Sequence, residues 1–146
     1  VIRTYSKSRS LAGARLGFAI GDAALIEDLE RIKYSMNPYD INRLTQIAGI
    51  ACLESDDYYK TNAENIMQIR EYTRKALEDR GFVVLPSSAN FVFAKKPGTT
   101  GKALYTLLRE NGVLVRWFDK ERIRDFLRIT IGTREQMDKL LLVLDK

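Results

Sequence analysis

Two short apolar segments near the start of the chain are separated by a polar loop. Residues 1–5 have the extended pattern of a short strand, and residues 6–13 are dense in polar side chains. Residues 16–20 then form a continuous apolar run closed by Gly21, which is more typical of a buried strand than of an exposed one. The pattern predicts two strands joined by a polar loop.

The next hydrophobic positions recur at helical spacing. Asp22 can cap a helix that precedes a turn at residues 37–40, where proline disfavours helix in the residue before it. The apolar face of this helix consists of Leu25, Leu29 and Ile32. A second helix is predicted over residues 42–53. A long helix follows over residues 56–80 and ends at Gly81, which suits a left-handed helix end.

The last part of the chain has a different order of elements. Thr133 begins a final helix, and Gln136, three residues later, completes a capping box. Strands are predicted before this helix over residues 82–85, 90–94, 113–115 and 126–131, with a helix over residues 100–111. The order strand-strand-helix-strand-strand-helix predicts a compact layer.

These elements predict an α/β protein in three parts. Residues 1–55 form one unit, residues 56–81 a linking helix, and residues 82–146 a small α/β domain. The first unit has only two strands, too few for an independently stable sheet. It also begins without Met on an extended segment. We therefore expect the chain to be part of something larger, in which residues 1–55 complete a sheet.

Composition indicates an ordered globular protein and excludes several classes. Hydrophobic residues make up 45% and charged residues 29%, which argues against disorder. No apolar run approaches the roughly 18 residues of a membrane helix, so no membrane partner is expected. Cys52 is the only cysteine, which excludes an internal disulfide. Together with the lack of a secretory signal, this favours a cytoplasmic location.

The chain contains no histidine, and its net charge is +5. Ser-His and Cys-His catalysis are thereby excluded, and the commonest metal ligand is missing, so no metal site is expected. The basic residues are spread among acidic ones, which favours a solvated surface over a nucleic-acid interface. The positive charge would suit small phosphorylated ligands.

One short segment combines a lysine with groups that bind anions. Hydroxyls and a guanidinium suit a phosphate dianion, glycines allow close approach of the backbone, and a lysine amine can form an imine with an aldehyde. The residues concerned are Thr4, Ser6, Lys7, Gly13, Arg15 and Gly17. A serine-rich surface loop with an incidental lysine is the alternative, but the apolar run that follows favours a site.

The segment T-Y-S-K-S-R-S-L-A-G-A-R-L-G-F-A-I-G resembles the cofactor-lysine segment of fold-type I pyridoxal phosphate aminotransferases, especially the histidinol-phosphate aminotransferase branch. Three further segments resemble that branch: N-P-Y-D-I-N-R-L-T-Q, S-S-A-N-F-V-F and F-L-R-I-T-I-G-T. The resemblance covers essentially the whole chain and lacks only the amino-terminal part of the family. It implies that residues 1–55 end the large pyridoxal phosphate-binding αβα domain and that residues 82–146 form the small carboxy-terminal α+β domain.

The resemblance also implies roles for individual residues. Lys7 corresponds to the Schiff-base lysine of pyridoxal 5'-phosphate, and Thr4, Ser6 and Arg15 to the residues that bind its phosphate. Substrate-binding roles are implied in the carboxy-terminal part: Arg128 as a fork for an anionic group, Arg116 near the substrate phosphate, and Asn90 as a residue that orients Arg128. For Arg116, a plain surface arginine is an equally open interpretation. Arg9 departs from the residue that many relatives carry, and no role is assigned to it.

The implied activity is amino transfer between histidinol phosphate (as imidazole acetol phosphate) and glutamate or 2-oxoglutarate in histidine biosynthesis. The resemblance implies a homodimer in the full-length protein, because Tyr39, Asn42 and Arg43 match positions where relatives approach the subunit interface. A helix entry with surface polar residues explains these three equally well. The residues that hold the cofactor ring belong to the amino-terminal part of the family, so we expect the chain by itself to be inactive.

Two alternatives remain at this stage. Another fold-type I pyridoxal phosphate enzyme, such as a threonine-phosphate decarboxylase or a different class I/II aminotransferase, would carry the same lysine loop. A non-catalytic basic α/β binding module is the alternative of a different class, although interleaved aromatics and a nucleic-acid motif are lacking.

Overall fold

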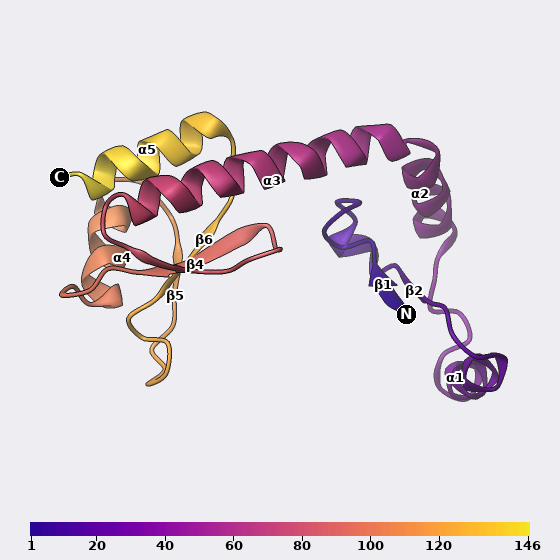
Figure 1. Ribbon diagram of the computed structural model, residues 1–146. Coiled ribbons are helices and arrows are strands. Elements are labelled where there is room, and N and C mark those ends of the chain that lie inside the picture. Colours follow the sequence, from indigo (N-terminus) through magenta and orange to yellow (C-terminus); the bar gives the residue numbers. More distant parts are fainter. The chain divides into compact units, whose positions relative to one another are not determined.

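The computed structural model describes residues 1–146, which divide into two compact units, Val1–Ala63 and Glu64–Lys146. The long helix α3 (Asp56–Glu78) runs from the first unit into the second (Figure 1). Both units mix helices and strands, as expected for an α/β protein. No helix is both long enough and apolar enough to cross a membrane.

The first unit begins with a two-stranded antiparallel ribbon. Strand β1 (Ile2–Thr4) pairs with β2 (Gly17–Ala19), and Thr4 lies opposite Gly17. Both strands were predicted, but the expectation that the second is buried is wrong: Phe18 is 43% exposed and Ile20 63% exposed. The reason is that an apolar run favours burial, but a strand is buried only where other elements of the protein pack against it. Here Phe18 packs edge-on against the ring of Tyr5 and still remains exposed.

Two capped helices complete the first unit. Helix α1 (Ala23–Met36) is capped by Asp22, whose carboxylate accepts a hydrogen bond from the Ala24 N–H. Helix α2 (Arg43–Glu54) is capped by Asn42, which accepts from the Thr45 N–H. The cap at Asp22 confirms the prediction, whereas Asn42, predicted as the first residue of the second helix, is its cap instead. The predicted apolar face of α1 is present but exposed, with Leu25, Leu29 and Ile32 all more than half accessible.

The second unit contains a four-stranded antiparallel sheet in the order β3-β4-β6-β5. Helices α4 (Gly101–Glu110) and α5 (Arg134–Leu144) follow β4 and β6 in the chain. The strands are β3 (Val83–Leu85), β4 (Phe91–Lys95), β5 (Arg116–Trp117) and β6 (Leu127–Thr130). Both halves of the capping box predicted at Thr133 and Gln136 are present.

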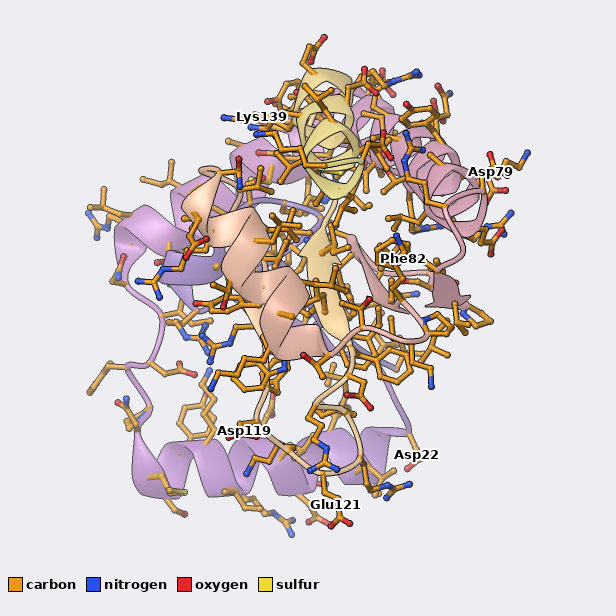
Figure 2. The ribbon with its side chains drawn as sticks, turned by 90° about the vertical axis from the view of Figure 1, so that its left-hand side faces the viewer. Asp22, Asp79, Phe82, Asp119, Glu121 and Lys139 are labelled. Carbon is orange, nitrogen blue, oxygen red and sulfur yellow. The ribbon has the colours of Figure 1, made fainter.

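One face of this sheet is buried and the other is open. Along β6, Leu127 and Ile129 are buried whereas Arg128 and Thr130 are exposed. The buried face of the sheet packs against side chains from α3, α4 and α5 in one core, among them Leu77, Leu108 and Leu140. Figure 2 shows polar side chains such as Asp79 and Lys139 directed outward from the unit. The sheet therefore has an exposed face that can carry functional side chains.

The strand predicted over residues 113–115 is wrong, because β5 begins only at Arg116. The alternation is real: Val113 and Val115 are half-buried, and Leu114 is 81% exposed. However, the hydrogen-bonded ladder with β6 starts at the pair Arg116 and Arg128. The preceding residues leave helix α4 through the left-handed Gly112, and the Val113 N–H donates to the Leu108 carbonyl. The alternation of buried and exposed side chains thus begins at Val113, three residues before the strand pairing begins at Arg116.

Candidate active site

Lys7 lies in a tight turn directly after strand β1. The Ser10 N–H donates to the Lys7 carbonyl at 3.1 Å, which closes the turn. The neighbouring Tyr5 is buried and anchors the loop at both ends, because its N–H donates to Leu16 and its carbonyl accepts from Leu11, each at 3.0 Å. The side chain of Lys7 itself is exposed. The fold thus fixes the main chain of Lys7 and leaves its amine accessible.

Two hydroxyl groups are gathered beside this lysine. The Thr4 hydroxyl donates to the Ser6 hydroxyl oxygen at 2.8 Å, and the Thr4 oxygen accepts from the Ser6 N–H at 3.1 Å. The second bond is a local side-chain turn, which is a common use of Thr at the end of a strand. The structure therefore brings Thr4 and Ser6 together next to Lys7.

The main chain at Arg15 leads back to the end of β1, where the Tyr5 N–H donates to the Leu16 carbonyl. Arg15 has a left-handed φ of 55°, which is uncommon for a residue other than glycine, asparagine or aspartate, and it follows the short 3-10 helix Ala12–Ala14. One guanidinium nitrogen donates to the Ala12 carbonyl at 3.1 Å, and the side chain remains exposed. Two residues later the chain reaches Gly17, the partner of Thr4 in the ribbon.

Of the two glycines near Arg15, only one is required by close packing. A Cβ on Gly17 would lie 2.8 Å from the Arg3 carbonyl oxygen, closer than a side-chain carbon can approach. A Cβ on Gly13 would meet nothing within 4 Å. The close approach expected of the glycines thus holds at Gly17, where it brings β2 against the end of β1.

The groups in this loop fit a phosphate-bearing aldehyde. Two hydroxyls and a guanidinium are donors suited to a phosphate dianion, and the exposed lysine amine is a nucleophile toward an aldehyde. All four residues lie within the first unit and on the one segment that spans β1, the loop and the start of β2. This donor set is what pyridoxal phosphate requires at its phosphate and its aldehyde carbon.

A second group of charged residues lies on the exposed face of the sheet in the second unit. Arg116 on β5 and Arg128 on β6 are register partners, so both side chains leave the same face of the sheet. Both are exposed, and each guanidinium carbon lies 5.3 Å from an aromatic ring centroid, that of Phe118 and that of Phe91 respectively. Like charges placed directly opposite one another are unfavourable. An anion between them would remove that cost.

A hollow of about 470 Å³ adjoins Arg128. It is lined by Leu85, Pro86, Ser87, Ser88, Ala89, Phe91, Phe93 and Arg128. The turn that forms its wall is fixed from two sides, because the Ser87 hydroxyl donates to the Phe91 carbonyl at 2.6 Å and Arg70 donates to the Ala89 carbonyl at 2.8 Å. The arginine therefore borders a largely apolar hollow.

Asn90 does not hold Arg128 in the way we expected. Its side chain is exposed and makes no hydrogen bond to Arg128, whose guanidinium contacts the Phe91 ring instead. The contact that Asn90 does make is through its main chain, since its carbonyl accepts from the Ile131 N–H at 2.9 Å. A substrate-binding role for Asn90 remains a prediction.

The residues considered for a subunit interface have ordinary structural positions. Tyr39 is 91% exposed in the turn before α2, Asn42 caps that helix, and Arg43 is its first residue.

One residue of the lysine loop, Arg9, was given no role from the sequence, but its side chain donates to Asp56 at the start of α3. Asp56 lies 47 residues further along the chain, so the residues around Arg9 gave no indication of this contact.

Comparison with known proteins decides the family. The family model described as aminotransferase class I and II matches residues 1–144. The chain belongs to this aminotransferase family. A histidinol-phosphate aminotransferase from Chromohalobacter salexigens is 51% identical to it over 145 residues, which cover 99% of the chain and 41% of that protein.

Solved structures of similar proteins share the fold of this aminotransferase chain. The structure of histidinol-phosphate aminotransferase from Sinorhizobium meliloti, in complex with pyridoxal-5'-phosphate, has a TM-score of 0.81 at 28% identity and covers 98% of this chain and 39% of that one. A decarboxylase from Sulfurospirillum multivorans has a TM-score of 0.72 at 26% identity, with 98% and 42% covered. The chain thus spans about two fifths of the length of the relatives it matches.

Proposed function

We propose that the protein is a pyridoxal phosphate-dependent aminotransferase of histidine biosynthesis. It would transfer an amino group between histidinol phosphate, as imidazole acetol phosphate, and glutamate or 2-oxoglutarate. The observation that carries this proposal is the arrangement of Thr4 and Ser6 beside an accessible Lys7 in a chain of this family. The relative from Chromohalobacter salexigens, half identical along the whole chain, supports the choice of substrate.

Each residue of the loop has a defined task in this proposal. Pyridoxal phosphate, when bound, supplies an aldehyde for amine exchange and a ring that accepts an electron pair. Lys7 would hold the cofactor through its amine, and the same amine, when free, would act as the base that takes the proton from the substrate Cα. The Ser6 hydroxyl would donate to the phosphate, the Thr4 hydroxyl, which donates to Ser6 here, would turn to it, and Arg15 would supply charged donors. The exposed Lys7 side chain leaves the substrate amine free to approach.

Arg116 and Arg128, which lie opposite one another on the sheet, would bind the anionic groups of the substrates. Histidinol phosphate offers a phosphate and no carboxylate, whereas glutamate offers carboxylates. A pair of guanidinium groups can bind either anion, because each anion presents two charged oxygens that can accept both bonds of one forked donor. Arg116 and Arg128 would therefore hold the two substrates in alternate half-reactions. The apolar hollow beside Arg128 would receive the uncharged part of the substrate.

The assembly and location of the protein belong to the same proposal. We infer a cytoplasmic homodimer in which Tyr39, Asn42 and Arg43 lie near the partner subunit. The large exposed side chain of Tyr39 supports this role, because aromatic residues are enriched in interfaces. Tyr39→Ser should shift the protein toward monomer in analytical ultracentrifugation. An unchanged sedimentation coefficient across the dilution series would count against an interface at this position.

The central test is covalent trapping of the cofactor on the protein produced at its natural length. Borohydride reduction in the presence of stoichiometric pyridoxal phosphate should place one cofactor on the peptide that contains Lys7. Lys7→Ala should lose this label and also lose turnover. Lys102→Ala, at an exposed lysine on α4, is the matched control and should keep both. Labelling spread over surface lysines, with none enriched at Lys7, would reject the proposal.

A decarboxylase is the second candidate, because a decarboxylase from Sulfurospirillum multivorans shares the fold at 26% identity. Both functions would give the same label on Lys7, so the products must distinguish them. Amino transfer converts 2-oxoglutarate to glutamate, whereas decarboxylation releases carbon dioxide from an amino acid such as phosphothreonine. Release of carbon dioxide without glutamate formation would favour the decarboxylase.

A further inference from the structure

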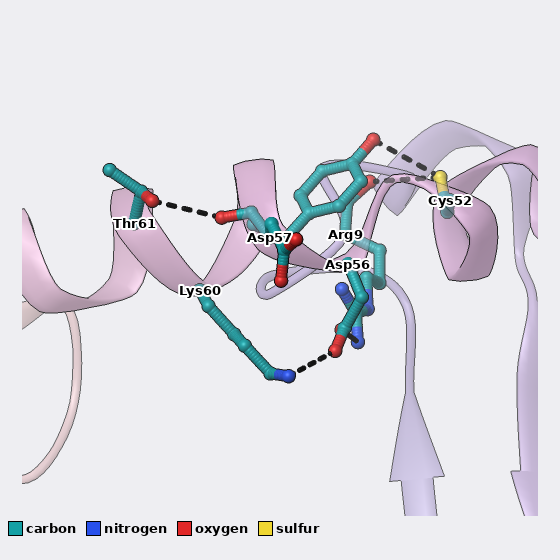
Figure 3. A network of polar contacts seen from close by, with 7 residues as sticks. Arg9, Cys52, Asp56, Asp57, Lys60 and Thr61 are labelled. Atoms are coloured by element: carbon teal, nitrogen blue, oxygen red, sulfur yellow. Dashed lines mark hydrogen bonds and ion pairs between the residues drawn. The ribbon is translucent and has the colours of Figure 1, made fainter.

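Arg9 lies two residues after Lys7, and its side chain is held by the beginning of helix α3 (Figure 3). One guanidinium nitrogen donates to Asp56 at 2.5 Å, and the guanidinium carbon lies 5.1 Å from the centroid of the Tyr59 ring. The Arg9 side chain is only 21% exposed. An arginine that is partly buried, paired and stacked is held more firmly than one in an open surface pair.

The main chain of the same residue is contacted by helix α2. The buried Cys52 thiol donates to the Arg9 carbonyl at 3.8 Å and lies 3.1 Å from the Tyr59 hydroxyl. The hydrogen bond with Cys52 raises the pKa of Tyr59, so this phenol is neutral at physiological pH. Two helices therefore contact Arg9, one through its side chain and one through its carbonyl.

The carboxylate of Asp56 is shared with a second cation that does not touch the loop. Lys60 donates to its other oxygen at 2.6 Å. Hydrogen bonds from Lys60 and Arg9 lower the pKa of Asp56, so that the carboxylate remains ionised at neutral pH. This arrangement offers a matched pair of cations on one carboxylate, of which only Arg9 belongs to the lysine loop.

The turn that contains Arg9 is the turn that fixes Lys7. It is closed by the hydrogen bond from the Ser10 N–H to the Lys7 carbonyl, and Ser10 has a left-handed φ of 56°. Such a conformation costs free energy and persists only where surrounding contacts hold it. The contacts of Arg9 with Asp56 and Tyr59 are the ones that attach this turn to helix α3.

We propose that Arg9 is a positioning residue, which holds the turn of residues 7–10 on helices α2 and α3 and thereby sets the place of the Lys7 amine. The inference rests on the proposed role of Lys7. It adds a determinant outside the cofactor-binding residues, since the side chain of Arg9 is paired with Asp56 and stacked on Tyr59. A misplaced amine transfers protons less efficiently even when the cofactor is bound, because proton transfer depends steeply on geometry.

The test compares Arg9→Gln and Asp56→Asn with the matched control Lys60→Gln in the protein at its natural length. Without cofactor, deuterium exchange of the peptide covering residues 5–11 should be faster in the first two variants and unchanged in the control. With cofactor, the pH at which the visible absorbance changes should shift in the first two. Their kcat should fall by about tenfold to a hundredfold, with KM for glutamate changed less than about twofold.

Combining Arg9→Gln with Asp56→Asn should add little to either single change, because each one breaks the same contact. Unchanged exchange, absorbance and kcat in both single variants would overturn the positioning role. So would equal losses in Lys60→Gln, which would indicate a general effect of charge on α3. Absence of the cofactor label on Lys7 in the unaltered protein would instead reject the proposed function, so the two failures are distinguishable.

Discussion

Replacement of Gly17 by alanine should weaken both the β1–β2 ribbon and the cofactor site. The new Cβ would lie 2.8 Å from the Arg3 carbonyl oxygen, whereas ordinary contacts begin near 3.4 Å. The obstacle is main chain in a paired strand, so it cannot rotate away and the strands must separate. Overpacking of this kind costs about 1–3 kcal/mol, from which the reduced entropy of the unfolded chain recovers about 0.4–1 kcal/mol. A net destabilisation of roughly 1–2 kcal/mol is expected.

The same displacement should reach Thr4, which is the register partner of Gly17. Loss of one hydrogen bond to a charged group costs about 1.5–3 kcal/mol, which corresponds to roughly a tenfold to hundredfold weaker affinity for pyridoxal phosphate. Urea unfolding measures the first effect, and fluorescence titration with the cofactor measures the second. Gly13→Ala is the matched control, because its Cβ would meet nothing within 4 Å. Equal stability and affinity in the two alanine variants would refute the reasoning.

Three further predictions concern the second unit. Leu108→Ala should destabilise the protein by about 2–5 kcal/mol in urea unfolding, because this side chain is fully buried; a loss below about 1 kcal/mol would contradict the packing. Arg116→Gln should abolish thermal stabilisation by inorganic phosphate while leaving the phosphate-free protein equally or slightly more stable, since it removes repulsion from Arg128; Arg122→Gln, in the β5–β6 loop, should behave like the unaltered protein. Hydrogen bonds from Arg80 lower the pKa of Asp145 from that of a free aspartate, so their stabilisation is present above the ordinary pKa and is lost as pH falls through the lower folded pKa; Asp145→Asn should flatten the acid limb of a stability–pH curve.

Features encoded by neighbouring residues were predictable from the sequence. The cap at Asp22 and the capping box at Thr133 each need only residues within one helical turn. The lysine loop was predictable for the same reason, because its hydroxyls, amine and guanidinium follow one another along the chain. The pairing of Thr4 with Ser6 depends on a two-residue spacing that the sequence displays directly.

Features that depend on distant partners were not predictable. Burial of residues 16–20 was expected from their apolar character, but burial requires a covering layer, and Ile20 is 63% exposed. Alternation over residues 113–115 indicated a strand, but strand pairing depends on β6 and begins at Arg116. Arg9 gave no signal because its partner, Asp56, is distant in the sequence.

Departures from ordinary folding preferences coincide with the residues assigned to function. Ser10 and Arg15 both adopt left-handed backbone conformations in the loop that carries Lys7. Arg116 and Arg128 place like charges directly opposite one another on an exposed sheet face. In contrast, the core of the second unit follows the usual alternation of buried apolar and exposed polar positions. Local conflicts of this kind destabilise a protein unless a ligand or a function compensates for them. The left-handed backbone in the lysine loop and the opposed arginines on the sheet therefore favour the proposed anion-binding roles of both places, on grounds separate from similarity to other proteins.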